Sequence, residues 1–163
     1  MSKTFFLISL TLLNTYSFAQ NQQQKRQIPT MHLAGKYEYG TSADKERVGL
    51  AYIYAESDST ILFYLDLNAG PPSLSMGSLL GRVKIKKDTG LFLTSLDDAK
   101  DSCKFLLRFK KDALIIKTVN SQYNCGFGHR VFADGTFKRI SWKNPLYFIN
   151  SEANKEYFRN LKL

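Results

Sequence analysis

Short runs of alternating apolar and polar residues, separated by turn-forming residues, occupy most of the chain beyond residue 34. Eight such runs stand out, at residues 35–40, 48–55, 60–67, 79–86, 90–95, 103–110, 113–120 and 131–140. An alternation with a period of two is typical of β-strands that bury one face, and no long stretch before the C-terminal segment has helical spacing. The short connections predict an all-β fold, a single antiparallel meander of about eight strands closed into a small barrel or sandwich.

Two of the expected hairpins can be put in register. The first turns at Lys111-Asp112, which pairs Lys110 with Ala113 and gives an apolar inward face made of Phe105, Leu107, Phe109, Leu114, Ile116 and Thr118. The second turns at Ser57-Asp58, which pairs Tyr54 with Ile61 and gives a core face made of Leu50, Tyr52, Tyr54, Ile61, Phe63 and Leu65. The interior of the predicted barrel is therefore aromatic, and Phe63, Phe105 and Phe109 either fill it or line a cavity.

The other face of the second hairpin is more apolar than a face in contact with water, because it still carries Ile53, Leu62 and Tyr64. Two explanations are open: the C-terminal segment of the chain covers this face, or a partner does. The C-terminal segment can itself form at most one short helix, or else a last hairpin of residues 146–149 and 156–159. Its Tyr-Phe pairs favour the hairpin.

The N-terminus has the pattern of a secretory signal peptide. Lys3 precedes an apolar run at residues 5–13, and the small residues Ser17 and Ala19 follow it. The run is too short to span a membrane. We expect a signal peptide at 1–19, a flexible polar lead-in at 20–32 and a single β domain at 33–163. The mature chain, cut near Ala19, is expected to be secreted or periplasmic, with no transmembrane segment.

The chain has only two cysteines, Cys103 and Cys125. In an exported protein an even number of cysteines favours a disulfide, and this pair would join the strand at 103–110 to the loop after the next strand. A zinc site would need two more ligands, and the only histidines are His32 and His129. We therefore predict a disulfide and no metal.

The chain is basic, with 23 Lys and Arg against 14 Asp and Glu, and this charge is unevenly distributed. Residues 82–163 carry 17 basic and 8 acidic side chains, whereas residues 20–81 carry 5 and 6. Strand parity places seven basic residues outward on neighbouring strands: Arg82, Lys84, Lys86, Lys104, Arg108, Lys110 and Lys117. Such a face attracts anionic envelope components, or it only keeps the strands soluble. Nucleic acid is the least favoured partner, because few aromatic residues interleave with these charges.

The connection at 68–77 is long for a barrel. Pro71 and Pro72 stiffen it, while Leu74 and Met76 belong to no expected strand. A rigid loop with an apolar tip suits entry into the cleft of a protein partner, because little conformational entropy is left to lose on binding. The alternative is a lid folded over one mouth of the barrel.

Candidate catalytic groups are few. The chain has none of the G-x-S-x-G, H-E-x-x-H or P-loop motifs. His129, near Asp134, is a candidate base for a hydrolase, but it is more simply a turn histidine. The acidic loop of Asp97, Asp98 and Asp101 lacks EF-hand spacing and is more simply a solvated turn. We expect no catalytic residue and no cofactor.

Several segments occur in the order of a known group. They are M-G-S-L-L-G at 76–81, a strand from Cys103 to Phe109, C-G-F-G at 125–128 and A-D-G-T-F at 133–137. Across residues 35–138 the chain resembles small exported bacterial β-barrel proteins of unknown function, similar in style to lysozyme-inhibitor-like domains. An extra cysteine pair often found near the first segment in such groups is missing here. The resemblance implies an exported barrel without catalysis, and the positive charge disfavours cationic lysozymes as partners.

Taken together, the pattern predicts an exported, non-enzymatic binding or inhibitor-like protein. It would engage an envelope or extracellular partner through the 68–77 loop, the basic strand face or both. The first alternative is a carrier that holds a small apolar ligand inside the barrel, and the second is a hydrolase that uses His129. The sequence does not predict the oligomeric state.

Overall fold

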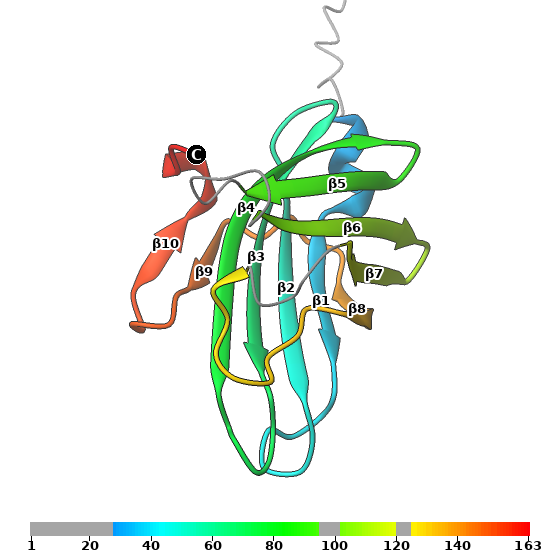
Figure 1. The fold of residues 1–163 in the computed structure, drawn as a ribbon. Coiled ribbons are helices and arrows are strands. Elements are labelled where there is room, and N and C mark those ends of the chain that lie inside the picture. The colour runs from blue at the N-terminus through cyan, green and yellow to red at the C-terminus, as the bar shows by residue number, and fades with distance from the viewer. Residues whose placement is uncertain (1–27, 95–101, 120–124) are drawn as a thin grey trace, which may run out of the picture.

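A computed structural model describes residues 28–94, 102–119 and 125–163, and it contains a closed barrel of eight antiparallel strands (Figure 1). The strands follow one another around the barrel in chain order, and β1 pairs with β8 to close it. Their bounds are β1 (Gly35–Tyr39), β2 (Val48–Ala55), β3 (Thr60–Asn68), β4 (Met76–Lys86), β5 (Thr89–Thr94), β6 (Cys103–Lys110), β7 (Ala113–Thr118) and β8 (Gly135–Ser141). The predicted all-β meander is confirmed. The expected signal peptide at 1–19 lies outside the described residues.

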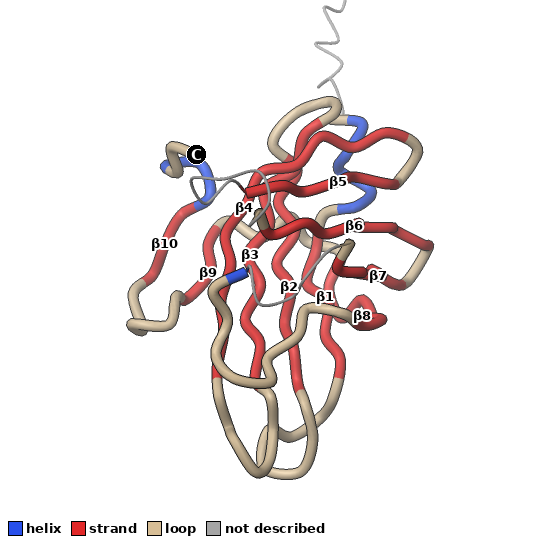
Figure 2. The backbone as a smooth tube through the Cα atoms, in the orientation of Figure 1, coloured by secondary structure: helices blue, strands red, loops and turns tan. Residues whose placement is uncertain are grey.

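Helical structure in the described ranges is limited to short 3₁₀ turns, drawn in blue in Figure 2. They include η1 (Pro29–Leu33) before the barrel and η3 (Phe158–Asn160) near the C-terminus. A separate two-stranded sheet, β9 (Tyr147–Ile149) with β10 (Lys155–Tyr157), follows the barrel. The C-terminal segment is thus a hairpin, the form that its Tyr-Phe pairs favour.

Aromatic side chains fill the barrel interior. The ring centroids of Phe63 and Phe92 lie 4.9 Å apart, and those of Phe92 and Phe105 lie 6.0 Å apart. The ring centroid of Phe127 lies 6.2 Å from that of Phe105. The packing against β4 is so close that a Cβ added to Gly81 would lie 2.5–2.6 Å from the rings of Phe92 and Phe63. Glycine at position 81 therefore makes room for this aromatic stack.

The β6–β7 hairpin has the predicted register, with Lys110 opposite Ala113 and Phe105 opposite Thr118. The predicted β2–β3 register is wrong by one residue. Tyr54 pairs with Leu62 rather than Ile61, because Glu56 and Ser57 both donate their backbone N–H to the Thr60 carbonyl and widen the turn.

The shift of one residue exchanges the two faces of β2. Ala51, Ile53 and Ala55 point into the barrel and are fully buried, whereas Tyr52 and Tyr54 point outward. The smaller side chains suit the interior because Ile53 lies directly opposite Phe63, and a tyrosine in its place would overfill the core.

The C-terminal segment covers the apolar outer face of β2, β3 and β4. Phe148 of β9 stacks on Tyr64 at 4.0 Å, and Phe158 of η3 stacks on Tyr54 at 5.3 Å. These side chains form a second hydrophobic cluster with Leu62, outside the barrel core. The first of the two explanations, coverage by the chain itself, is therefore correct for Leu62 and Tyr64, whereas Ile53, also expected on that face, lies in the barrel core.

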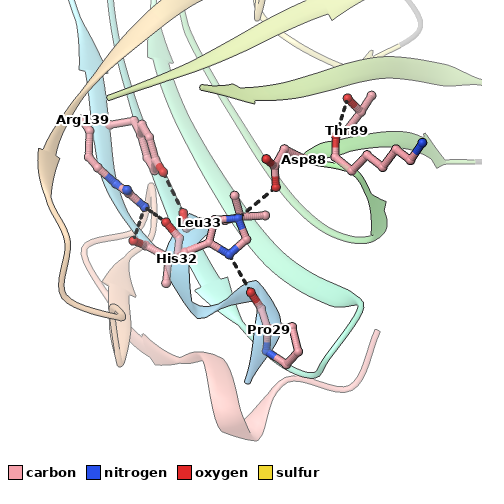
Figure 3. A network of polar contacts seen from close by, with 9 residues as sticks. Pro29, His32, Leu33, Asp88, Thr89 and Arg139 are labelled. Atoms are coloured by element: carbon pink, nitrogen blue, oxygen red, sulfur yellow. Dashed lines mark hydrogen bonds and ion pairs between the residues drawn. The ribbon is translucent and has the colours of Figure 1, made fainter. Parts of the chain in front are cut away.

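The 3₁₀ turn η1 is tied to the barrel by a buried arginine (Figure 3). Arg139 of β8 donates from Nη2 to the carbonyl oxygens of His32 (2.7 Å) and Ala34 (2.8 Å), and its guanidinium lies over the Tyr37 ring. The Tyr37 hydroxyl donates to the Leu33 carbonyl at 2.7 Å, and burial raises the pKa of Tyr37 to about 12. Residues 29–32, expected to belong to a flexible lead-in, are therefore ordered against the barrel.

Candidate functional site

The connection between β3 and β4 is held by its own backbone hydrogen bonds. The Ala69 N–H donates to the Ser75 carbonyl at 2.8 Å, and the Leu74 N–H donates to the Gly70 carbonyl at 2.9 Å. The Asn68 side chain accepts a bond from the Gly70 N–H at 2.8 Å, which fixes the entry to the loop. Met76 and Gly77, expected in the loop, are the first residues of β4.

Two neighbouring segments brace this loop from outside. The β1–β2 connection lies beside it at the lower end of the barrel in Figure 1, so close that a Cβ on Gly70 would lie 2.5 Å from the Glu46 backbone. On the other side the Gly128 N–H donates to the Met76 carbonyl at 3.2 Å, and the Ser73 hydroxyl donates to the His129 carbonyl at 3.4 Å. The loop backbone is therefore supported along its length.

The apolar side chains of the loop face solvent, and so does that of Met76 at its base. Leu74 is 51% exposed and Met76 is 57% exposed, and Pro71 and Pro72 are exposed as well. A lid over the barrel mouth would bury such apolar side chains against the core. Their exposure fits a braced loop that presents an apolar tip better than it fits a lid.

A recess of about 330 Å³ adjoins the loop on the outer wall of β1, β2 and β3. Glu38, Leu50 and Asp66 lie in one cross-strand row at its base, and Met76 from the loop side also lines it. Its lining includes two carboxylates and no basic residue. The recess therefore has the charge and shape to accept a cationic side chain with an apolar stem.

Asp66 is half-buried in this recess, and desolvation raises the pKa of its carboxyl above the ordinary value of 3.8. No hydrogen bond or ion pair joins the carboxylate to another described residue. The sequence carries one signal for this site that the prediction did not use. Asp66 is the single carboxylate in the otherwise largely apolar run T-I-L-F-Y-L-D-L-N.

Replacing Asp66 with asparagine should raise stability at neutral pH. The folded state holds the Asp66 proton more tightly than the unfolded chain, so this group makes stability fall as pH rises from about 3.8 through the higher folded pKa. In urea titrations Asp66→Asn should have a higher midpoint than the wild type at pH 7, and this difference should disappear at pH 3. Asp44→Asn, at an exposed position of the β1–β2 connection, is the matched control. An equal midpoint at pH 7 would contradict the desolvation of Asp66.

The seven predicted basic residues all point outward from β4, β6 and β7. Arg82 is engaged within the chain, because it pairs with Glu56 at 2.8 Å and donates to the Leu163 carbonyl. Lys86 lies opposite Thr89, and Thr89 lies opposite Arg108, so these charges follow one another from β4 across β5 to β6. The four strands β4 to β7 contain no acidic residue.

His129 does not join a catalytic arrangement in the part of the chain that the structure describes. Its side chain is exposed and has no hydrogen bond or ion pair with a described residue, and only its backbone carbonyl is bonded. The Asp134 carboxylate instead accepts bonds from the backbone N–H of Thr118 at 3.1 Å and from its hydroxyl. No group of three potential metal ligands occurs in the described ranges, and the acidic loop of Asp97, Asp98 and Asp101 lies outside them.

The predicted disulfide is present between Cys103, at the start of β6, and Cys125. Both residues are buried, and Cys125 leads into the segment that braces the β3–β4 loop. The bridge therefore joins that bracing segment to the barrel wall.

Within the described ranges no helix is both long enough and apolar enough to cross a membrane. The sequence matches no known family model, and no curated protein or solved structure shows significant similarity to it.

Proposed function

We propose that this chain is an exported, non-enzymatic binding protein that holds a protein partner with the tip of its β3–β4 loop. The observation that supports the proposal most strongly is the combination of a braced backbone with the exposed side chains Pro71, Pro72, Leu74 and Met76. Apolar side chains on a backbone that is already ordered lose little conformational entropy when they enter a cleft. The loop thus has the properties of an inhibitor-like binding element.

The acidic recess next to the loop adds a second contact. Met76, the first residue of β4 at the base of the loop, also lines the recess, so a partner that contacts both the loop and Met76 would pass over Glu38 and Asp66. The partner best suited to this surface has an apolar cleft with a lysine or arginine beside it. The resemblance stated for the sequence implies an exported barrel without catalysis and does not identify the partner.

The two alternatives have less support. A carrier would need space for its ligand inside the barrel, where the close packing of Phe63, Phe92 and Phe105 leaves little. A hydrolase would need a group to orient His129, whereas the Asp134 carboxylate is bonded to Thr118.

The loop proposal predicts that negative charge on the loop and at its base weakens partner binding. Leu74→Asp/Met76→Asp would place two carboxylates in an apolar cleft, which should weaken binding by about tenfold or more per buried charge. Native mass spectrometry of protein purified from its own host would identify the partner, and titration with the purified partner would measure the affinity.

The matched control is Leu91→Asp/Leu93→Asp, which makes the same change at two equally exposed leucines on β5. This control should bind the partner as the wild type does. Unchanged affinity of the loop variant would overturn the proposal, and a small molecule retained in place of a protein would favour the carrier.

The basic outer face of β4, β6 and β7 is a second proposed surface, for an anionic envelope component. The proposal is supported by the absence of acidic residues within the strands β4, β5, β6 and β7 themselves, although Glu56 from the β2–β3 connection pairs with Arg82. Retention on an immobilised polyanion that weakens as salt rises is the behaviour this surface requires.

A further inference from the structure

Three of the most exposed aliphatic side chains of the described structure lie among these basic residues. Leu91 and Leu93 of β5 are 57% and 54% exposed, and Val119, just beyond β7, is 57% exposed. A simple polyanion-binding surface has no need of large aliphatic side chains in solvent. Their position therefore indicates that the partner offers an apolar region as well as anionic groups.

The strand register places the apolar and basic side chains in one continuous pattern. Leu93 pairs with Lys104, whose carbonyl accepts the backbone N–H of Val119, so these three residues form one row. Leu91 pairs with Leu106, which pairs with Lys117 in a second row. Cross-strand neighbours of this kind lie about 5 Å apart, so the apolar patch and its cations occupy the same face.

The next row continues the same mixture, with Thr89 beside Arg108 and Arg108 beside Ile115. Lys84 and Lys86 on β4 and Lys110 at the β6–β7 turn lie at the margin of the face. Acidic residues of the described ranges lie beside these strands rather than on them: Asp88 and Asp112 are in turns, and the Asp134 carboxylate is bonded to Thr118 at the end of β7. The face is thus apolar at its centre, cationic around it, and free of carboxylates on its strands.

We propose that the outer face of β5, β6 and β7 attaches the protein to the surface of an anionic lipid membrane. This inference rests on the proposed anion-binding role of the basic face and narrows its partner to lipid. Leucine and valine side chains enter the boundary between headgroups and acyl chains, while lysine and arginine side chains reach the phosphates around them. A soluble polyanion offers anionic groups to the lysine and arginine side chains, but no apolar layer to the leucine and valine side chains.

Two variants separate these contacts. Leu91→Ser/Leu93→Ser removes apolar side chains and keeps every charge, whereas Lys84→Gln/Arg108→Gln/Lys117→Gln removes charge and keeps the leucines. Binding is measured by co-sedimentation with vesicles of phosphatidylcholine mixed with phosphatidylglycerol, and by retention on heparin resin, at an ionic strength where the Debye length is about 10 Å. Circular dichroism melting verifies that each variant is folded.

The expected result is a different response in the two assays. The leucine variant should lose about tenfold or more of its vesicle affinity and elute from heparin with the wild type. The glutamine variant should lose affinity in both assays, and vesicles of phosphatidylcholine alone should bind none of the proteins.

Matched controls test whether position matters rather than composition. Leu74→Ser makes the same kind of change at an exposed leucine on the β3–β4 loop, and Lys45→Gln/Lys143→Gln/Lys162→Gln removes the same net charge elsewhere. Both controls should bind vesicles as the wild type does.

Each contrary outcome has a distinct meaning. If the leucine variant binds vesicles like the wild type while the glutamine variant loses both activities, the membrane inference fails and the anion-binding face stands. If the glutamine variant matches the wild type in both assays, the anion-binding face fails and the inference with it. If the wild type dimerises in solution and the leucine variant does not, the face is occupied by a second copy of the chain, and the membrane inference is overturned.

Discussion

Replacing Cys103 and Cys125 together with alanine should lower the free energy of unfolding by about 3 kcal/mol, because the unfolded chain is no longer closed into a loop by a bond that spans 22 positions. Alanine is the suitable replacement, since both residues are buried and serine would add an unpaired hydroxyl. Urea titration under oxidising conditions should give a midpoint about 1–3 M below that of the wild type.

Reductant supplies the control for the cysteine variant. In dithiothreitol the wild type should have the same urea midpoint as the alanine variant. The midpoint of the variant itself should not change with dithiothreitol. If the wild type and the variant have the same urea midpoint without reductant, the bridge adds no stability.

The bridge also has an expected consequence for the candidate site. Cys125 precedes the segment in which Gly128 and His129 bond to the β3–β4 loop, so loss of the bridge frees one end of that brace. The alanine variant should therefore be cleaved faster than the wild type in the β3–β4 loop under native conditions. Mass spectrometry of early proteolytic fragments would locate the cut, and unchanged cleavage would show that the brace does not depend on the bridge.

The sequence was sufficient for the elements whose determinants are local. Alternation along the chain located all eight barrel strands, and the Lys111-Asp112 turn fixed the β6–β7 register. The presence of only two cysteines, together with the expected export of the chain, was enough to predict their pairing. In each case the information lies in neighbouring residues or in residue type and count.

Features that depend on contacts distant in the chain were not predicted. Both faces of β2 carry apolar residues, so their pattern did not reveal which face is buried, and the outer cluster with Phe148 and Phe158 resolves the ambiguity. The link from Arg139 to η1 joins residues more than one hundred positions apart. The recess at Asp66 likewise exists only because β1, β2, β3, the start of β4 and the β1–β2 connection meet there.

Replacing Phe63 with alanine should have the largest effect, a loss of about 3–5 kcal/mol in the free energy of unfolding. The Phe63 side chain is fully buried and makes an edge-to-face contact with Phe92 in the centre of the aromatic stack. Its removal leaves a cavity that the β-sheet backbone is too constrained to close. The matched control is Leu93→Ala on the outer face of β5, which should change stability by less than about 0.5 kcal/mol.

The same variant discriminates between a packed interior and a carrier. A cavity lined by Phe92, Phe105 and the Gly81 backbone would be apolar and dry, so it should bind a benzene-sized ligand and gain thermal stability from it. The wild type, whose interior holds the Phe63 ring in that space, should show no such shift in melting temperature. A wild-type protein that benzene stabilises as strongly as Phe63→Ala would have free volume in its interior, and the carrier would then replace the loop-mediated binding protein as the better account of this barrel.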